Sequence, residues 1–408
     1  MTSHTARNPR ASKKPTARAH RQLRILWSSN SVTTSSGYGT QSRNILYRML
    51  DADYATAHVA FAGIEGGIFE LEGLTIYPRL MDPFGEDACI VHARDWRADV
   101  TFTFQDIWIL DPEKLRKFQR WIPYVPIDSD PLLPAVAERL RLAYEIVTLS
   151  QFGHRMLESH GFSSTCIPHG VDTSTFAPSA KQAARRYFGL PRDTYLFGMV
   201  AANLDNPSRK GFQEALDAFQ LFHTRHPKSA LFIHTSARDP RRGFPIGDYA
   251  TMLGLSEVVY GLPEYTAILK LDPAHLARLY SAFDCLLAPS AREGFGLPII
   301  EAQSCGVPVI VNNTTSMPEL VGAGAVCEVG WKWWLNRGTY SPQPDVLSLS
   351  EKMEEIYRAD RDALASRARR FVLTNYDIDD IFEKKWRPYL TRLEHRVKRK
   401  RRRAPRDG

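Results

Sequence analysis

The sequence lacks several features that define other classes of protein. Its 408 residues include five cysteines, an odd number with no C-x-x-C pair, which argues against a disulfide framework and against a zinc site. No apolar run approaches the roughly 18 residues that cross a bilayer, and the apolar group at 23–27 is shorter than the core of a secretory signal. No repeat with a period of about 20–50 residues is visible, which excludes a solenoid. We therefore expect a cytoplasmic globular protein.

Acidic residues are missing from positions 1–24, which carry seven Arg or Lys, and residues 392–408 also have a net charge of +7. Because the whole chain carries +8, residues 25–391 carry a net −6. Nucleic-acid-binding proteins usually carry positive charge on the folded surface, so an acidic body argues against one. We expect disordered basic tails at 1–22 and 395–408, which could contact nucleic acid or make the protein peripheral to an anionic membrane. Solvated ends without a partner would show the same pattern.

The chain alternates between short β-like runs and segments of helical composition. This alternation starts again after a Pro/Gly-punctuated stretch at 167–178, so the sequence predicts two consecutive α/β halves with mostly parallel sheets. The predicted strands are 24–27, 58–63, 89–93, 99–104, 121–127 and 145–150 in the first half and 195–202, 231–236, 256–261, 285–290 and 308–312 in the second. Helices are predicted at 211–224, 273–282 and 298–305, and near the end at 376–394.

The stretch REGFGLPIIEAQSCGVPVI, residues 292–310, carries the strongest chemical signal. It follows a predicted strand and begins a helix, and in open parallel sheets ligands bind at such junctions, where helix N–H groups are free. Gly294 and Gly296 allow N–H groups up to Leu297 to face sugar hydroxyls or phosphate oxygens. Glu293 and Glu301 could each accept hydrogen bonds from a vicinal diol, one from a hexose and the other from a ribose. An acidic helix start that complements the dipole is the alternative.

EGFGLPIIEA followed by CGVPVI resembles the signature of retaining glycosyltransferases of family 4. Three further stretches resemble that family in the right order, so that the resemblance covers approximately residues 24–392. They are SQFGHRMLESHGF with IPHGVDTSTFAP, similar to the interdomain segment; VAANLDNPSRKGFQEALDAF, similar to the phosphate-binding stretch; and LARLYSAFDCLLAPS, similar to the strand before the donor loop. The family more often has Asn at the position of His169.

The resemblance implies the GT-B fold, in which two Rossmann-like domains face each other across a cleft. It implies an acceptor domain at 23–172, a nucleotide-sugar donor domain at 173–375 and a helix at 376–394 that packs back towards the first domain. The implied reaction moves a hexosyl unit from a UDP- or GDP-sugar to an acceptor hydroxyl with retention of configuration. No metal or other cofactor is required for it. The acceptor could be a glycan, protein, lipid or nucleic acid.

The resemblance also implies roles for particular residues. Arg209 and Lys210 would contact the donor diphosphate, and two cations in a sheltered cleft stabilise the charge that develops on a leaving nucleotide. Asp106 would approach the anomeric carbon or orient the acceptor, although a loop acid that caps the next element is an equal alternative. Donor binding would also involve Gly37 and Gly39 of the SSGYG loop, together with Gly294, Phe295, Gly296, Leu297 and Glu301.

Two motifs have weaker interpretations. SSGYG lacks the third glycine of the dinucleotide-binding fingerprint, and this argues against an enzyme that depends on a nicotinamide cofactor. IDSDP, residues 127–131, contains a D-x-D of the kind that binds metal in another glycosyltransferase architecture, but here we interpret it as an acceptor-side turn. WKWWLNRGTY, residues 331–340, could stack an acceptor or a partner, and ordinary packing against the domain is expected instead.

Two other functions remain open at this level. The same fold could glycosylate nucleic acid, or a protein associated with nucleic acid, through the basic tails. A non-catalytic module that binds a sugar nucleotide would carry much of the same motif set. No short motif encodes the sugar, the base or the acceptor, because one hydroxyl contact can change the preferred substrate.

Overall fold

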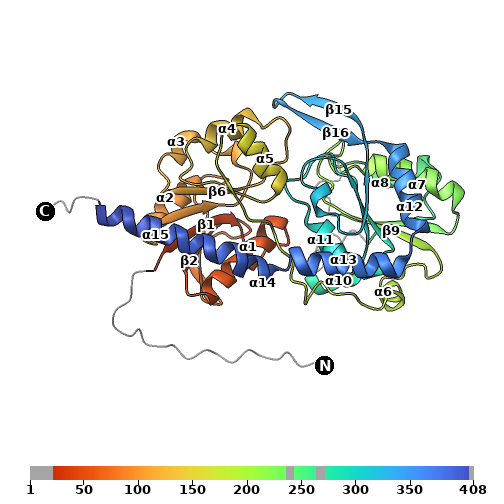
Figure 1. Ribbon diagram of the computed structural model, residues 1–408, viewed down its shortest axis with the longest axis horizontal. Coiled ribbons are helices and arrows are strands. Elements are labelled where there is room, and N and C mark those ends of the chain that lie inside the picture. Colours follow the sequence, from red (N-terminus) through yellow and green to blue (C-terminus); the bar gives the residue numbers. More distant parts are fainter. Residues whose placement is uncertain (1–21, 236–242, 263–271, 404–408) are drawn as a thin grey trace.

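The computed structural model describes residues 22–235, 243–262 and 272–403, and these form two α/β units that lie side by side (Figure 1). Each unit contains its own sheet, as the alternation predicted. Residues 1–21 and 404–408, which make up most of the predicted basic tails, lie outside the described residues.

The first unit is built on an eight-stranded sheet of order β3-β4-β2-β1-β5-β6-β7-β8. All of its pairings are parallel except that between β3 and β4, and its central strands are apolar runs buried on both faces. The strands are β1 (Arg24–Asn30), β2 (Ala55–Ala62), β3 (Phe69–Leu71), β4 (Leu74–Pro78), β5 (Val100–Thr103), β6 (Trp121–Val125), β7 (Val147–Thr148) and β8 (Thr165–Cys166). The helices are α1 (Gly37–Asp51), α2 (Glu86–Asp95), η1 (Ile107–Ile109), α3 (Pro112–Leu115), α4 (Pro134–Leu140) and α5 (Gln151–Ser159).

The strand predicted at 89–93 is wrong, because this segment lies inside helix α2. Glu86 and Asp87 stand in the first turn, where negative charge complements the helix dipole. Cys89 and His92 are buried three positions apart, which is helical spacing. An apolar run of five residues does not by itself distinguish a strand from a buried helical face.

The second unit has a six-stranded sheet of order β11-β10-β9-β12-β13-β14 in which all pairings are parallel. Its strands are β9 (Tyr195–Val200), β10 (Ser229–His234), β11 (Val259–Tyr260), β12 (Cys285–Ala288), β13 (Val309–Asn312) and β14 (Gly324–Cys327). Its helices are α6 (Lys181–Tyr187), α7 (Phe212–Arg225), α8 (Ile246–Met252), α10 (Pro273–Ala282), α11 (Leu297–Ser304), η2 (Pro318–Leu320), α12 (Val346–Arg358) and α13 (Arg361–Asn375).

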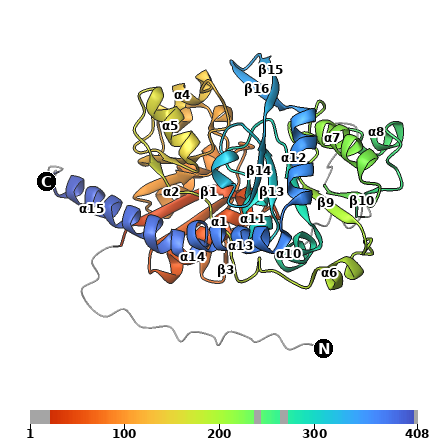
Figure 2. The same ribbon diagram turned by 45° about the vertical axis from the view of Figure 1, so that its right-hand side comes forward.

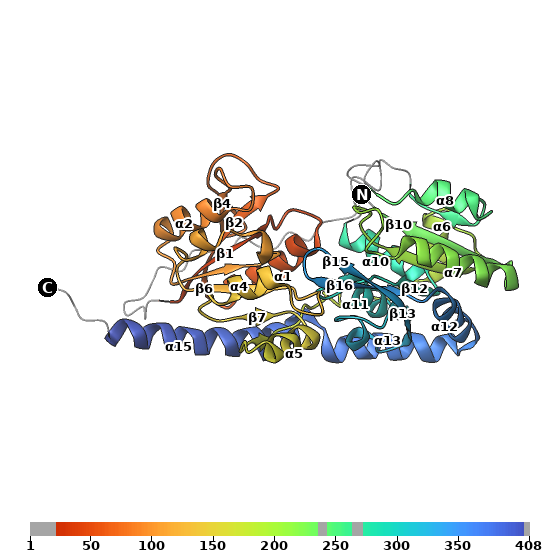
Figure 3. The ribbon, with the colours of Figure 1, turned by 90° about the horizontal axis from the view of Figure 1, so that it is seen from above.

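An antiparallel hairpin, β15 (Val329–Leu335) with β16 (Thr339–Pro344), projects from the second unit towards the first (Figures 1 and 3). It carries the tryptophan-rich motif. Trp331, Trp333 and Trp334 are 50%, 48% and 58% exposed. The expectation that these indoles pack against the domain is therefore wrong, because β15 is mostly exposed while its partner β16 is mostly buried.

The chain crosses between the units near Val171 and again near Tyr376, and the two crossings are hydrogen-bonded to each other. Beyond the second crossing, α14 (Ile378–Ile381), the π-helical turn η3 (Phe382–Trp386) and α15 (Arg387–Arg403) run along the first unit (Figure 2). Trp386 is fully buried there, with its ring centroid 5.9 Å from Trp27 and 5.1 Å from Tyr124. The last helix thus covers the sheet of the first unit.

Residues 395–403, predicted to belong to a disordered tail, instead continue helix α15. Leu393 and Val397 are buried four positions apart, and Arg396 pairs with Glu145 of the first unit at 3.0 Å. The prediction rested on the charge of this segment and missed its narrow apolar face. It also overlooked that Lys and Arg are good helix formers.

The contact made by Trp386 generates the first prediction. Trp386→Ala should lower the free energy of unfolding by about 3–5 kcal/mol, because it removes a large buried ring and leaves a cavity beside Trp27. Urea denaturation followed by circular dichroism measures the change. Arg392→Ala, on the exposed face of the following helix α15, should change stability by no more than about 0.5 kcal/mol. A Trp386→Ala variant as stable as the control would contradict the anchoring role of this ring.

Candidate functional site

Two loops of the second unit meet at the carboxyl edge of its sheet. One follows β9 and the other follows β12, and these strands are parallel neighbours. A Cβ atom on Gly211 would lie 2.3 Å from the carbonyl oxygen of Pro289, so glycine is what allows the loops to approach so closely. The backbone N–H of Ala291 donates to the carbonyl of Arg209 at 2.8 Å. The loop that carries Arg209 is therefore fixed to the loop that carries the acidic motif.

The structure brings Arg209, Lys210 and Glu293 together at this junction. The Nζ atom of Lys210 is 2.5 Å from Oε1 of Glu293, and Nη1 of Arg209 is 3.6 Å from Oε2 of the same carboxylate. Arg209 Nη1 also donates to the carbonyl of Arg292 at 2.7 Å. Two cations from one loop thus flank a carboxylate from the other.

The charges of this cluster are set by burial and by the ion pairs together. Burial by itself raises the pKa of Glu293, but Lys210 and Arg209 outweigh it and lower this pKa to about 2. Burial lowers the pKa of Lys210, and Glu293 partly compensates. The carboxylate is therefore ionised at neutral pH.

The acidic loop is held by residues that the sequence analysis missed. The backbone N–H of Glu293 donates to the hydroxyl of Thr315 at 3.1 Å. The hydroxyl of Ser316 lies 2.9 Å from the carbonyl of Glu293 and 2.7 Å from that of Phe295. Both residues follow β13, which pairs with β12, so their position just after the neighbouring parallel strand was an available signal.

The first unit faces this loop through backbone atoms. Gly37 begins α1, and Ser36 caps that helix by accepting from the N–H of Gly39 at 3.1 Å. A Cβ atom on Gly37 would lie 3.4 Å from the side chain of Leu297, and one on Gly294 would lie 2.5 Å from Pro126. Gly294 thus allows the two units to approach closely, whereas a side chain at Gly37 would make an ordinary van der Waals contact with Leu297.

Acidic side chains of the first unit face the basic side chains of the second. Asp106 follows β5 and is hydrogen-bonded to Tyr38. Burial and then the nearby Asp128 raise the pKa of Asp106, while Arg209 lowers it. Asp106 is nonetheless accessible to solvent. Asp106 makes no side-chain hydrogen bond that caps η1, so the capping alternative is not what this geometry shows.

Arg292 and Tyr38 are site residues that the sequence analysis did not identify, and Asp128 lies in the IDSDP stretch that it interpreted as an acceptor-side turn. Nη1 of Arg292 is 3.6 Å from Oδ2 of Asp128, and this ion pair joins the two units. Nε of Arg292 is buried without a hydrogen-bond partner among the described residues. Asp128 follows β6, the neighbour of β5, so it occupies the same sheet edge as Asp106. That shared edge was the available signal.

Three residues predicted to bind the donor make contacts within the protein. In the described part of the chain, Glu301 accepts a hydrogen bond from Tyr280 at 2.8 Å rather than joining the basic pair, and burial raises its pKa to about 7. The ring of Phe295 is buried between the units, 5.0 Å from that of His169. Gly39 packs against the preceding loop, where a Cβ atom on it would lie 2.3 Å from Oγ1 of Thr34.

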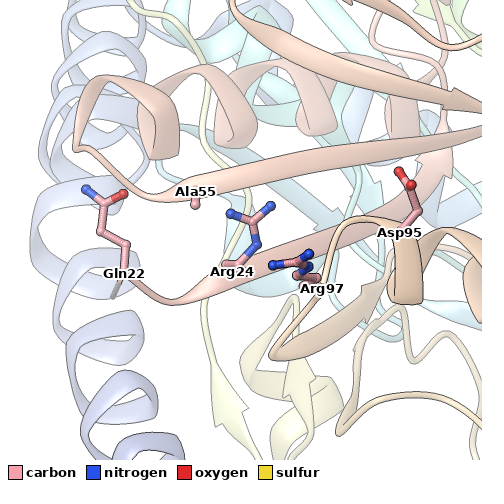
Figure 4. Close-up of a pocket in the computed structure, with 5 residues that line it drawn as sticks. All are labelled: Gln22, Arg24, Ala55, Asp95 and Arg97. Carbon is pink, nitrogen blue, oxygen red and sulfur yellow. The ribbon is translucent and has the colours of Figure 1, made fainter. Parts of the chain in front are cut away.

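A hollow on the first unit lies away from this site (Figure 4). It is lined by Gln22, Arg24, Ala55, Asp95 and Arg97. Arg24 and Ala55 are the first residues of β1 and β2, so the hollow lies at the amino ends of these strands. Because ligands of open parallel sheets bind at the carboxyl ends, we do not assign it to the same ligand.

Across residues 22–235, 243–262 and 272–403, no group of three or more His, Cys, Asp or Glu side chains has a spacing that could hold a metal ion. Within the same residues, every helix is too short or too polar to cross a membrane.

Residues 183–371 match the sequence model of the family described as glycosyl transferases group 1. A D-inositol 3-phosphate glycosyltransferase from Corynebacterium jeikeium is 30% identical over 187 residues, which are 44% of this chain and 43% of that protein. The O-antigen chain mannosyltransferase B from Escherichia coli is 57% identical over 54 residues, 13% of this chain and 14% of that protein. The chain thus spans less than half the length of these two curated relatives.

Solved structures match over much more of the chain. Sucrose-phosphate synthase from Thermosynechococcus elongatus has a TM-score of 0.72 at 18% identity, and the match covers 91% of this chain and 99% of that one. HepE from Anabaena, in complex with UDP and glucose, has a TM-score of 0.67 at 17% identity and coverage of 91% and 100%. The fold is GT-B, as the resemblance implied. Together with the match over residues 183–371, it supports a glycosyl transferase of group 1.

Proposed function

We propose that this chain is a retaining glycosyltransferase of family 4 that moves a hexosyl unit from a nucleotide-diphosphate sugar, a UDP- or GDP-sugar, to an acceptor hydroxyl. The observation that carries the proposal is the cluster of Arg209, Lys210 and Glu293 at the carboxyl edge of the second sheet. The relatives named as glycosyltransferases support the reaction type, and the fold shared with a UDP-bound protein supports the donor class.

In this proposal Arg209 and Lys210 bind the donor diphosphate. The acceptor oxygen forms a bond to the anomeric carbon while the bond between that carbon and the phosphate oxygen breaks. The acceptor proton passes to the departing phosphate oxygen on the same face of the sugar, so configuration is retained. Two cations in a partly dehydrated cleft stabilise the negative charge of the leaving group, and this is the basis for proposing that no metal is required.

The remaining roles follow from position. Glu293 accepts hydrogen bonds from sugar hydroxyls, and Glu301 accepts them from the ribose once the nucleotide is bound. Asp106, hydrogen-bonded to Tyr38, orients the acceptor hydroxyl from the first unit. The basic ends at 1–21 and 404–408 lie outside the described residues. Glycosylation of nucleic acid through these ends, and their contact with a membrane surface, therefore remain hypotheses from the sequence.

Loss of Lys210 tests the proposed chemistry. Lys210→Ala should reduce kcat/KM for transfer or donor hydrolysis by at least about 100-fold, the size of effect seen when one charge-stabilising group is removed. Release of UDP or GDP from UDP-glucose and GDP-mannose measures it. Lys385→Ala, an exposed cation far along the chain, should keep the parent activity.

A buried carboxylate left without its partner can also destabilise the protein. Lys210→Met combined with Glu293→Gln removes both charges and should restore stability but not turnover. Parent-level activity in either variant would contradict the proposed function.

Glu301 gives a pH-dependent prediction. Its pKa is about 7 in the fold against 4.5 for a free glutamate. Between these two pH values the unfolded chain releases a proton that the folded chain keeps. Stability should therefore fall as pH rises through this window, by about 3 kcal/mol, and level off above it.

Urea unfolding at a series of pH values should show this fall in the parent protein. Glu301→Gln should remove it, because glutamine does not titrate. Glu351→Gln, at an exposed position of α12, should leave the slope unchanged. A slope that persists in Glu301→Gln would show that another group is responsible.

A further inference from the structure

The hairpin of β15 and β16 connects the donor loop to the first unit. At its base, the side-chain amide of Asn312 lies 3.2 Å from the carbonyl of Pro342 and 3.2 Å from that of Ser290, the residue at which the donor loop begins. Ser290 is itself hydrogen-bonded to Glu293. The hairpin therefore starts directly beside the proposed donor site.

The outer half of the hairpin contacts the first unit. The N–H of Tyr340 donates to the carbonyl of Asp130 at 3.3 Å, and the guanidinium of Arg337 lies 4.8 Å from the ring centroid of Trp108. Asp130 belongs to the same turn as Asp128, which pairs with Arg292. The hairpin thus lies across the space between the units, over the acceptor side of the site (Figure 3).

The two faces of the hairpin differ. Trp331 is opposite Gln343 and Trp333 is opposite Ser341, and cross-strand partners share a face. Gln343 and Ser341 are both buried, and we call the face that they share with Trp331 and Trp333 the inward face. Trp334 is on the other face, opposite Tyr340, where both rings are largely exposed.

The inward face carries an aromatic surface that the rest of the protein does not cover. The rings of Trp331 and Trp333 have centroids 4.1 Å apart and planes inclined by 52°, and each residue remains about half exposed. Across the strand from them the buried amide of Gln343 donates to the carbonyl and the hydroxyl of Ser341, at 3.2 and 3.1 Å. The two rings form exposed apolar surface beside the proposed site, and such surface marks a binding site.

This combination suits a saccharide. A pyranose has a patch of C–H groups on its face and hydroxyls around its edge, so it can pack flat against an indole while its hydroxyls bond polar neighbours. An anionic membrane would instead require basic residues on the same face as these two indoles. Lys332, which lies between them in the sequence, is paired with Pro342 on the other face, and the guanidinium of Arg337 contacts Trp108. The basic helix α15 lies along the opposite side of the molecule, away from the hairpin (Figures 1 and 2).

We propose that the Trp331–Trp333 face is an acceptor subsite for a glycan of at least two pyranose rings. One ring presents its hydroxyl at the cleft, and a neighbouring ring stacks on the indoles. The proposal rests on the proposed glycosyltransferase function and gives the class of its acceptor.

The test measures binding of defined saccharides to the full chain in the presence of UDP and of GDP. Mannotriose, maltotriose and cellotriose are compared with mannose and glucose by titration and by saturation-transfer NMR. At least one trisaccharide should bind 10-fold or more tightly than its monosaccharide. Trp331→Ala combined with Trp333→Ala should weaken that binding by about 10-fold or more. Trp334→Ala, the same residue type on the outer face, should leave it within about two-fold.

The outcomes separate this proposal from the proposed function. Stabilisation by UDP or GDP, followed by thermal shift, should be equal in the parent and in the double variant. If neither nucleotide binds the parent, the proposed function fails. If a nucleotide binds but no trisaccharide does, or if the double variant binds the trisaccharide as well as the parent, the acceptor subsite is overturned. If the parent sediments with phosphatidylglycerol vesicles and the double variant does not, the tryptophans bind a lipid surface and the acceptor subsite is overturned.

Discussion

The pairing of Glu293 with Arg209 and Lys210 is the interaction on which the arrangement of the site depends. Two adjacent cations repel each other in a partly buried space, and the carboxylate between them offsets that repulsion. The pairing exists because β9 and β12 are parallel neighbours, so that the loops after them leave the sheet at the same edge. The fold therefore places the charges, and their mutual attraction fixes the loops.

The loop that carries Glu293 is also a contact between the two units. Gly294 lies against Pro126, and Phe295 packs its ring against His169. A buried imidazole beside aromatic rings explains the histidine as a packing residue: burial lowers its pKa to about 3, and Nδ1 lies 2.9 Å from the hydroxyl of Tyr124. A ligand that moves this loop would therefore act on the interface between the units as well.

The site has three kinds of surface, each from a different part of the chain. Cations come from the loop after β9, acidic side chains come from the carboxyl edge of the first sheet, and indoles come from the hairpin β15–β16. A diphosphate, a hydroxyl and the C–H face of a sugar ring require these three chemistries. Their convergence in one region favours a reaction that joins a charged donor to a saccharide over simple nucleotide binding.

The sequence by itself determined the features that local patterns encode. Alternating periodicity predicted two α/β halves, the helix at 273–282 was predicted to the residue, and the glycine-rich acidic loop was placed correctly between a strand and a helix. Tertiary structure decided which surfaces meet. In the folded chain the apolar run at 89–93 is one face of a helix, and α15 continues through 395–403. Asp128 pairs with Arg292, and Glu301 is buried against Tyr280. These outcomes depend on contacts between residues far apart in the chain, and short-range periodicity carries no information about such contacts.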